Sequence, residues 1–264
     1  QEIALLKAAG IYIHIPFCVR KCPYCSFTSF TPEKIPEKEY INAMLKEIET
    51  RCRETDIPDI GTVYFGGGTP SLISPGGISA ILSAIAENFK LTNPETTIEV
   101  NPGTVNLERL RGYRSAGINR LSIGVQSFND RLLVNLGRSH SSKDALNAFE
   151  SARKAGFDNI SIDLIHSIAG ESLQDWKDDL AETVSLHPEH ISAYNLTIEE
   201  GTPFHHSQEK GLLVLPPEEE QAEMLLTAIE ILCIAGYEHY EVSNYAKPGF
   251  RSRHNQIYWK GGDY

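Results

Sequence analysis

The chain of 264 residues has 41% hydrophobic and 22% charged residues, a composition typical of a folded protein with one large core. Its net charge of −11 argues against a nucleic-acid-binding surface, because phosphate binders need clustered cations. Its apolar runs are shorter than the roughly 20 residues that span a membrane, and no signal-peptide pattern opens the chain, so we expect a cytoplasmic location.

Short apolar runs alternate with amphipathic segments of helical period along most of the chain. The predicted strands lie at residues 11–15, 62–65, 97–100, 120–124, 159–164 and 190–196. The predicted helices between them lie at 36–53, 76–89, 106–115, 142–155 and 172–186, and Gly117 and Gly156 are expected to end two of them in a left-handed conformation. This alternation predicts repeated βα units around a parallel sheet. Because six units are too few for a closed eight-unit barrel, the pattern favours an incomplete α/β barrel.

The last part of the chain differs from the rest. A helical segment at 217–235 leads to a strand-like run at 237–242, and the tail from 243 to 264 is aromatic and basic without a clear period. We expect a barrel domain over residues 1–240 and the start of a C-terminal region over residues 241–264. Since the chain begins without Met and stops after Gly-Gly-Asp-Tyr, we expect the remainder of that region to be absent.

Three of the five cysteines form a C-x3-C-x2-C motif in the loop after the first predicted strand: Cys18, Cys22 and Cys25. An odd number of cysteines, three of them crowded together, argues against a secreted disulfide framework. Three thiolates can bind three irons of a [4Fe–4S] cluster and leave the fourth iron open. An open iron can chelate the amino and carboxylate groups of S-adenosylmethionine (SAM) and deliver an electron to its sulfonium.

A structural zinc site with His14 as the fourth ligand is the competing interpretation. Zinc prefers four closed ligands, usually from two paired knuckles, and the sequence has no second C-x2-C. His14 alternates with Tyr12 along a strand, which favours a core histidine. The motif therefore favours the iron–sulfur cluster. Cys52 and Cys233 stand alone in helical segments, where we expect buried, inert thiols.

Polar residues gather near the carboxyl ends of the predicted strands, where α/β barrels keep their sites. The run Gly-Gly-Gly-Thr-Pro at 66–70 follows the second strand, and its glycines let backbone N–H and C=O groups approach a ligand. Glu99, Gln126 and Asp163 lie near the ends of the next three strands. Each alone is commonly a cap or a structural hydrogen bond, but together they suit the hydroxyl and amino groups of a ligand.

Taken together, these motifs resemble the oxygen-independent coproporphyrinogen III oxidase family of radical SAM proteins. The resemblance rests on Tyr-Ile-His-Ile-Pro-Phe-Cys at 12–18, the glycine run at 66–70, Glu-Val-Asn-Pro at 99–102, Arg-Leu-Ser-Ile-Gly-Val-Gln-Ser-Phe at 120–128 and Asp-Leu-Ile at 163–165. It implies a radical SAM partial (β/α)6 TIM-like barrel, followed by a smaller C-terminal domain that is mostly missing here. It also implies a [4Fe–4S] cluster on the three cysteines, with SAM as the cofactor.

The resemblance further implies roles for individual residues. Tyr12 would lie beside the cluster, and Tyr24 would pack near the adenine of SAM. The methionyl amino end would be held by Gly67, Gly68 and Thr69. The other SAM-binding residues would be Arg138 for the carboxylate, Glu99 and Gln126 for the ribose, and Asp163, which would complete the pocket.

The family has two branches, which differ in the cysteine motif, in the N-terminal arm and in a motif near residue 254. The oxidases have a further cysteine where this chain has Phe27, and a longer N-terminal arm where only ten residues precede residue 11. The run His-Asn-Gln-Ile-Tyr-Trp at 254–259 matches the H-N-x-x-Y-W motif of the HemW-type haem chaperones. His254 could ligate haem iron, with the Tyr/Trp pair packed on the porphyrin. A hydrogen-bonding role for His254 in a domain junction is the alternative.

The resemblance therefore implies a haem chaperone that passes haem to an acceptor protein, which can be membrane-associated, and that needs an electron donor for its cluster. The rival is an oxidase that decarboxylates the propionates of coproporphyrinogen III with a 5'-deoxyadenosyl radical, and a radical SAM enzyme with another substrate is a third interpretation. One departure stands out: His-Ser-Ile-Ala-Gly at 166–170 replaces a Tyr-Gly-Leu-Pro-Gly-like turn, so cofactor affinity or use is expected to differ.

Overall fold

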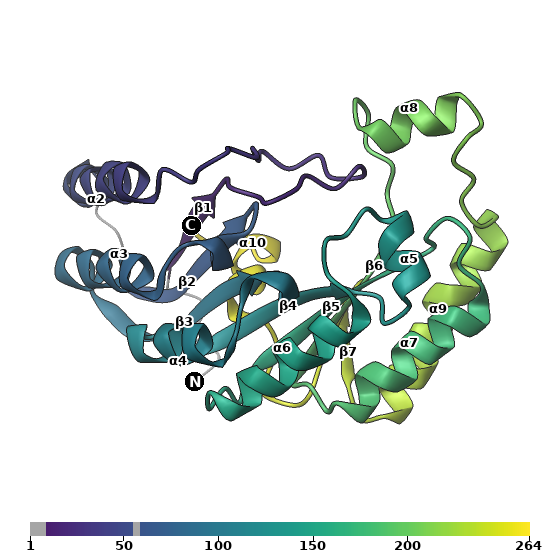
Figure 1. Ribbon diagram of the computed structural model, residues 1–264. Helices are drawn as coiled ribbons and strands as arrows, with labels where there is room; N and C mark the ends of the chain where they lie inside the picture. The colour runs from purple at the N-terminus through teal and green to yellow at the C-terminus, as the bar shows by residue number, and fades with distance from the viewer. Residues whose placement is uncertain (1–8, 55–58) are drawn as a thin grey trace.

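Six parallel strands form the centre of the fold, side by side in the order in which they occur along the chain (Figure 1). The computed structural model describes residues 9–54 and 59–264; residues 1–8, most of the short segment compared above with the oxidase arm, lie outside this range. The strands are β1 (Ala9–Ile15), β2 (Ile60–Gly67), β3 (Leu91–Val100), β4 (Arg120–Gln126), β5 (Ile160–His166) and β6 (His190–Asn195). Within the described residues β1 and β6 do not pair, so the barrel is open and the predicted partial barrel is confirmed.

Helices follow the strands, and most of them cover the outer face of the sheet, whereas the short helix after β6 lies apart from the sheet (Figure 1). They are α2 (Glu37–Glu54), α3 (Pro75–Asn88), α4 (Leu107–Ala116), α5 (Asp130–Asn135), α6 (Ser142–Lys154), α7 (Leu173–Ser185), α8 (Pro203–Glu209) and α9 (Glu218–Ile234). The six longer ones lie where the sequence predicted them, and the short α5 and α8 were not predicted. Gly117 and Gly156 follow α4 and α6 with φ of 113° and 90°, which confirms both expected helix ends.

Residues alternate along each strand between an apolar and a polar face, as the two-residue period of a strand requires. The face toward the helices carries buried apolar side chains such as Ile13, Val63, Ile98, Ile123 and Ile162. The inner face carries polar side chains from every second position, including Tyr64, Glu99, Arg120, Ser122, Asp163 and Ser192. The same strands therefore supply the core on one side and a polar interior on the other.

The C-terminal residues pack onto the barrel at both of its edges. β7 (Glu238–Glu241) and β8 (Asn244–Ala246) form an antiparallel hairpin that continues the sheet beside β6. The short helix α10 (Arg253–Trp259) contacts β1 and β2. β8 and α10 fall within the tail that showed no periodic pattern, and they were not predicted. The domain boundary after residue 240 stays a prediction.

The two isolated cysteines are less buried than expected. Cys233 is exposed, so the expectation of a buried thiol is wrong there. The apolar face of α9 consists of Met224, Ala228 and Leu232, and the residue after Leu232 points about 100° away from it. Cys52 is partly buried, with its thiol 3.2 Å from Asn88 Oδ1.

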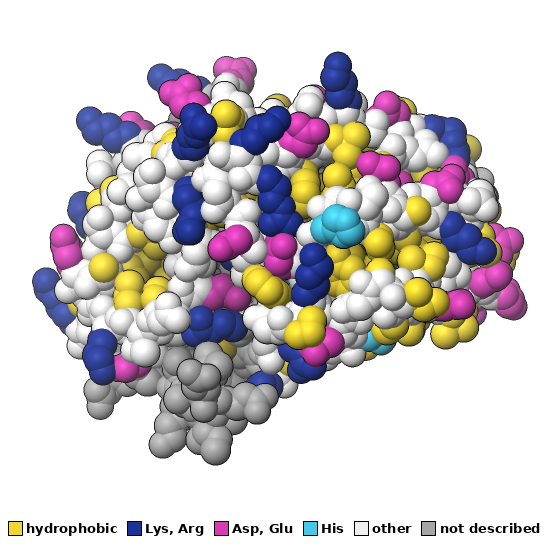
Figure 2. Space-filling model, turned by 90° about the horizontal axis from the view of Figure 1, so that it is seen from below, with side chains coloured by type: hydrophobic (Ala, Val, Ile, Leu, Met, Phe, Trp, Pro, Cys, Tyr) yellow, Lys and Arg dark blue, Asp and Glu magenta, His cyan; other side chains and the backbone are white. Residues whose placement is uncertain are grey.

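The surface carries charges of both signs. Figure 2 shows one face on which Lys and Arg side chains are interspersed with Asp and Glu side chains, with hydrophobic patches between them. Among the helices of residues 9–54 and 59–264, none is long and apolar enough to cross a membrane. A one-signed basic surface of the kind that binds nucleic acids is not visible on the described part of this face.

Candidate functional site

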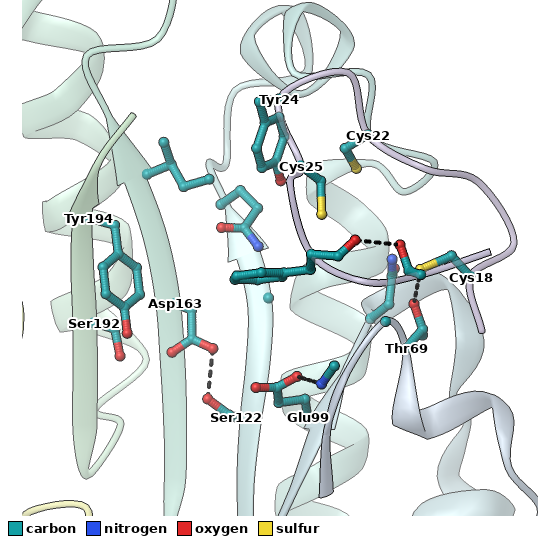
Figure 3. Close-up of a pocket in the computed structure, with 18 of the residues that line it drawn as sticks. Cys18, Cys22, Tyr24, Cys25, Thr69, Glu99, Ser122, Asp163, Ser192 and Tyr194 are labelled. Atoms are coloured by element: carbon teal, nitrogen blue, oxygen red, sulfur yellow. Dashed lines mark hydrogen bonds between the residues drawn. The ribbon is translucent and has the colours of Figure 1, made fainter. Parts of the chain in front are cut away.

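The three cysteines of the motif lie on the loop between β1 and α2, at one side of a cavity in the mouth of the open barrel (Figure 3). The loop is fixed by backbone hydrogen bonds, from Cys18 N to Phe30 O (2.9 Å) and from Phe30 N to Pro16 O (2.8 Å). Cys25 N donates to Cys22 O across a turn (3.1 Å). All three thiols are free and partly exposed. The fold thus presents three sulfur ligands to one cavity.

The cavity has a volume of about 410 Å³, which lies within the range of small-molecule sites. The structure brings most of the predicted site residues to its wall. These are Cys18, Cys22, Tyr24, Cys25, Gly67, Gly68, Thr69, Glu99, Gln126, Arg138 and Asp163. Phe27, at the position where the resemblance to the oxidases implies a further cysteine, also lines it. Tyr12 and His254 do not.

The spacing of the thiols does not suit a single ion. In residues 9–54 and 59–264, the three Sγ atoms do not all lie within 4.8 Å of one another, as ligands of one ion would. A cubane binds each thiolate to a different iron and so needs wider spacing. His14 is engaged elsewhere, with Nδ1 3.1 Å from Tyr12 Oη and Nε2 2.8 Å from Thr28 O. The geometry therefore does not support the zinc alternative.

The glycine run after β2 packs directly against the cysteine loop. Gly68 N donates to Ile15 O (2.7 Å), and Thr69 N donates to Phe17 O (2.8 Å). Thr69 Oγ1 also donates to Cys18 Sγ (3.6 Å). A Cβ atom at Gly68 would lie 2.8 Å from Phe17 O and 3.0 Å from Cys18 Sγ. Only glycine fits here, and this close approach holds the first cysteine in place.

Arg138 joins the cysteine loop to β4. Its Nη2 donates to Gly124 O (3.1 Å), while Nη1 lies 3.5 Å from Tyr24 Oη and 3.6 Å from Cys22 Sγ. The side chain lies between these elements, and its buried Nε has no hydrogen-bond partner. A guanidinium with an unused donor beside a cavity suits a carboxylate.

Glu99 lies at the inner end of the cavity. Its carboxylate accepts hydrogen bonds from Tyr64 Oη (3.0 Å) and Gly67 N (3.2 Å). Burial raises its pKa to about 7 in spite of these donors. Gln126 ends β4 with φ of 69°, a left-handed conformation that is uncommon for a residue other than glycine. Both side chains offer groups that can pair with hydroxyls of a ligand.

Asp163 is held by two serines on neighbouring positions of the inner face. Ser122 Oγ donates to Oδ2 (2.6 Å) and Ser161 Oγ donates to Oδ1 (3.0 Å) (Figure 3 shows the first bond). Burial raises the pKa of Asp163 as well. Several other residues of the wall were not predicted from the sequence, among them Tyr64, Arg120, Ser122, Ser192 and Tyr194. Their positions two apart along predicted strands were the available signal.

Tyr12 and His254 lie near each other where α10 contacts β1 and β2, with 6.4 Å between their ring centroids, but Tyr12 is exposed and His254 is buried. His254 is 1% exposed, its Nδ1 is 2.7 Å from Thr62 Oγ1, and its Nε2 is 2.7 Å from Tyr258 Oη. Its ring stacks on Tyr64 with 4.9 Å between centroids, and burial lowers its pKa to about 4. Both ring nitrogens are therefore occupied in this arrangement, and the haem-ligating role of His254 stays a prediction.

The turn at residues 166–170, which was expected to differ from the turn of the resembling family, does not line the cavity. Ser167 has φ of 65°, and its Oγ lies 2.9 Å from His166 Nδ1. Glu171 Oε2 accepts from Ile168 N (2.9 Å). The cavity wall includes Ile165 but no residue of 166–170. An effect of this loop on SAM would therefore act through Asp163 and Ile165.

Comparisons with known proteins show the family of this chain. The model of the radical SAM superfamily matches residues 12–182. The chain is 41% identical over 265 residues to "Heme chaperone HemW" of Haemophilus influenzae, covering 98% of this chain and 68% of that protein. It is 39% identical over 255 residues to the protein of the same name from Bacillus subtilis, covering 96% and 67%.

The fold is similar to that of the coproporphyrinogen III oxidase HemN of Escherichia coli, described as a radical SAM enzyme. The TM-score is 0.82 at 26% sequence identity, over 93% of this chain and 57% of that one. The chain thus spans about two thirds of the curated relatives and less of this enzyme.

Proposed function

This chain belongs to the HemW-type branch of the radical SAM superfamily, and from that membership we propose that it is a haem chaperone, which binds haem and transfers it to an acceptor protein. The observation that carries the proposal is the similarity, over nearly the whole chain, to relatives that bear this name. We place the activity in the cytoplasm, with an electron donor and a haem-acceptor protein as partners.

The residues around the cavity fit a [4Fe–4S] cluster together with SAM. The cluster would supply one-electron reduction of the sulfonium. Cys18, Cys22 and Cys25 would hold the cluster, and Arg138 would pair with the carboxylate of SAM. The backbone of the glycine run and Thr69 would meet the amino end. Glu99 and Gln126 would hold the ribose, while Tyr24, Tyr12 and Asp163 would complete the surroundings.

The rim of the cavity suits an apolar, dianionic porphyrin. Phe27 is 66% exposed and Val19 is 67% exposed, so the cysteine loop offers apolar surface to solvent. Arg20 and Lys21 lie between them in sequence and line the cavity. Cations beside an apolar surface can pair with the two haem propionates. His254 would become an iron ligand only after leaving Thr62 or Tyr258.

A haem titration of the cluster-loaded protein without oxygen, followed at the Soret band, tests the proposal. We expect one haem per chain, weaker binding for His254→Ala, and unchanged binding for the exposed control His239→Ala. Weaker binding for Phe27→Ala would locate the porphyrin at the rim. A folded, cluster-loaded chain that takes up no haem would contradict haem binding by these residues.

The alternative function is oxygen-independent decarboxylation of coproporphyrinogen III, which the structural similarity to HemN favours. Both functions need the same cofactor site, so the barrel alone does not separate them. The resemblance implies that the oxidases share a further cysteine at the position of Phe27. The presence of Phe27 there argues for the chaperone. Release of two CO2 per coproporphyrinogen would establish the alternative.

A further inference from the structure

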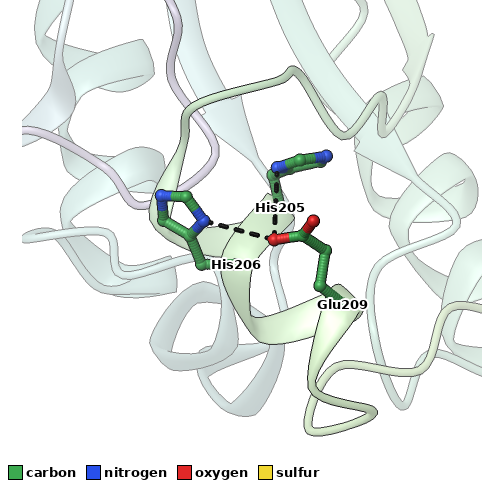
Figure 4. A group of neighbouring side chains, drawn as sticks. All are labelled: His205, His206 and Glu209. Carbon is green, nitrogen blue, oxygen red and sulfur yellow. Dashed lines mark hydrogen bonds and ion pairs between the residues drawn. The ribbon is translucent and has the colours of Figure 1, made fainter.

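A group of metal-ligating side chains lies on α8, outside the site described above. Figure 4 shows His205 and His206 directed toward Glu209, one turn further along the helix. Glu209 Oε2 lies 3.9 Å from His205 Nδ1 and 3.4 Å from His206 Nδ1. The three ligand atoms all lie within 4.8 Å of one another, and no other such group occurs in residues 9–54 and 59–264.

The separations of 3.4 and 3.9 Å are close to those between ligands of one ion. Zn–N and Zn–O bonds of about 2.1 Å in a tetrahedral site place ligand atoms about 3.4 Å apart. His206 Nδ1 and Glu209 Oε2 are within reach of a long hydrogen bond, whereas His205 Nδ1 is too far from Glu209 for one. His205 Nδ1 is buried and has no hydrogen-bond partner. A cation between the three atoms would use this nitrogen, which the protein alone leaves unsatisfied.

The helix that carries the group is fixed at its start. Thr202 Oγ1 accepts a hydrogen bond from His205 N (3.2 Å), and Thr202 is buried. Phe204 N donates to Pro23 O of the cysteine loop (3.0 Å), and the Phe204 ring lies 6.1 Å from that of Tyr24. The positions of the two histidines therefore depend on tertiary contacts and not on the seven-residue helix alone.

We propose that His205, His206 and Glu209 bind one divalent first-row transition-metal ion. Two imidazole nitrogens and one carboxylate oxygen form a set that suits Zn²⁺, Co²⁺ or Ni²⁺, whereas Mg²⁺ and Ca²⁺ prefer oxygen ligands throughout. The side chains of His206 and Glu209 are 62% and 61% exposed, so an ion can enter from solvent and keep water as its remaining ligands. The net charge of −11 attracts cations to the protein as a whole.

This ion would be separate from the iron–sulfur cluster. None of its ligands is a cysteine, and none lines the cavity of the cysteine loop. Its helix nevertheless touches Pro23 and Tyr24 of that loop. The proposal does not depend on haem binding.

Zinc calorimetry on the cluster-loaded protein without oxygen tests the site. We expect one Zn²⁺ per chain beyond the cluster, and loss of this binding in His206→Gln and in Glu209→Gln. His187→Asn, which removes an exposed histidine at the opposite end of β6, should bind zinc as the unchanged protein does. Iron content reports whether each variant keeps its fold around the cluster.

X-ray absorption at the zinc edge identifies the ligands in the same samples. We expect a shell of nitrogen and oxygen near about 2.0 Å with outer scattering from imidazole, and no sulfur shell. A sulfur shell would assign the zinc to cysteines and overturn the proposal. Zinc binding that persists in the double variant His205→Gln/His206→Gln, or no binding by the unchanged protein, would overturn it as well.

Discussion

Tyr64 donates a hydrogen bond to Glu99 inside the open barrel, with 3.0 Å between the phenol oxygen and Oε1. Gly67 N, from the end of the same strand as Tyr64, donates to the other carboxylate oxygen. Burial nevertheless raises the pKa of Glu99 to about 7. A carboxylate that sits beside a cofactor cavity thus changes its protonation near neutral pH.

The protein without SAM should lose stability as pH rises, because of Glu99. A carboxyl whose pKa is higher in the folded than in the unfolded state stabilises the fold fully below its unfolded pKa. That contribution is lost as pH rises through about 7. The shift from 4.5 to about 7 corresponds to roughly 3 kcal/mol. In Glu99→Gln the loss should disappear, so the thermal midpoint of the variant should fall less between pH 5 and pH 8.

The difference between the two proteins isolates Glu99 from other groups. Burial raises the pKa of Glu171 to about 8 and that of Asp179 to about 6, so both titrate over the same range. They are present in both proteins and cancel in the comparison. Glu150→Gln, an exposed carboxylate on α6, is the control. If the thermal midpoints of Glu99→Gln and the unchanged protein fall equally as pH rises, the raised pKa of Glu99 is contradicted.

Gly68→Ala should weaken retention of the cluster. The added methyl group would meet Phe17 O at 2.8 Å and Cys18 Sγ at 3.0 Å, so the cysteine loop must move. Gly76→Ala is the matched control, because a Cβ there meets only Ser74 Oγ at 3.8 Å. Iron content after anaerobic reconstitution and buffer exchange measures the effect. Equal iron content in the two variants would show that the loop adapts without cost.

Each of Cys18→Ala, Cys22→Ala and Cys25→Ala should lose the cluster. Removing any one thiolate leaves two protein ligands for a cubane that needs three. Cys233→Ala removes an exposed thiol on α9 and should retain about four irons per chain. Iron and sulfide analysis with absorbance near 400 nm measures this. If one of these variants keeps a full cluster, the cysteine that it lacks is not a ligand of the cluster.

Arg138→Lys should lower SAM affinity by roughly tenfold or more, since one ammonium cannot replace a guanidinium that joins several partners. Lysine keeps the charge but cannot contact Gly124 O and Tyr24 together with a carboxylate. Equilibrium dialysis with labelled SAM on cluster-loaded protein measures the loss, and Arg131→Lys on the exposed side of α5 is the control. Unchanged SAM affinity in Arg138→Lys would show that Arg138 does not bind the SAM carboxylate.

The sequence was sufficient for the barrel because its strands and longer helices carry strong periodic patterns. It was insufficient where structure depends on distant contacts. α10 is one short helix, and the partner of His254 is Thr62, which lies 192 positions earlier. The burial of Arg138 depends likewise on Tyr24 and Cys22, more than a hundred residues away. Local sequence patterns do not predict such long-range contacts.

For the site, motif spacing located the cysteines and the glycine run, and the strand ends located Glu99, Gln126 and Asp163, but the serines of the polar interior were not predicted. Ser122 and Ser161 show their role only through the register of β4 and β5, which pairs them side by side. A search for polar residues two apart on neighbouring strands would have found both, together with Arg120 and Ser192. The register itself follows from the whole sheet, which the sequence does not display.

The most direct test of the proposed function is a pair of parallel assays without oxygen on the cluster-loaded protein with SAM and a reductant. One sample receives haem and a haem-binding protein in its apo form. The second sample receives coproporphyrinogen III. The account predicts transfer of haem to the apo-protein, seen as a shift of the Soret band, and no release of CO2. Release of two CO2 per coproporphyrinogen, with no haem bound or transferred, would contradict it.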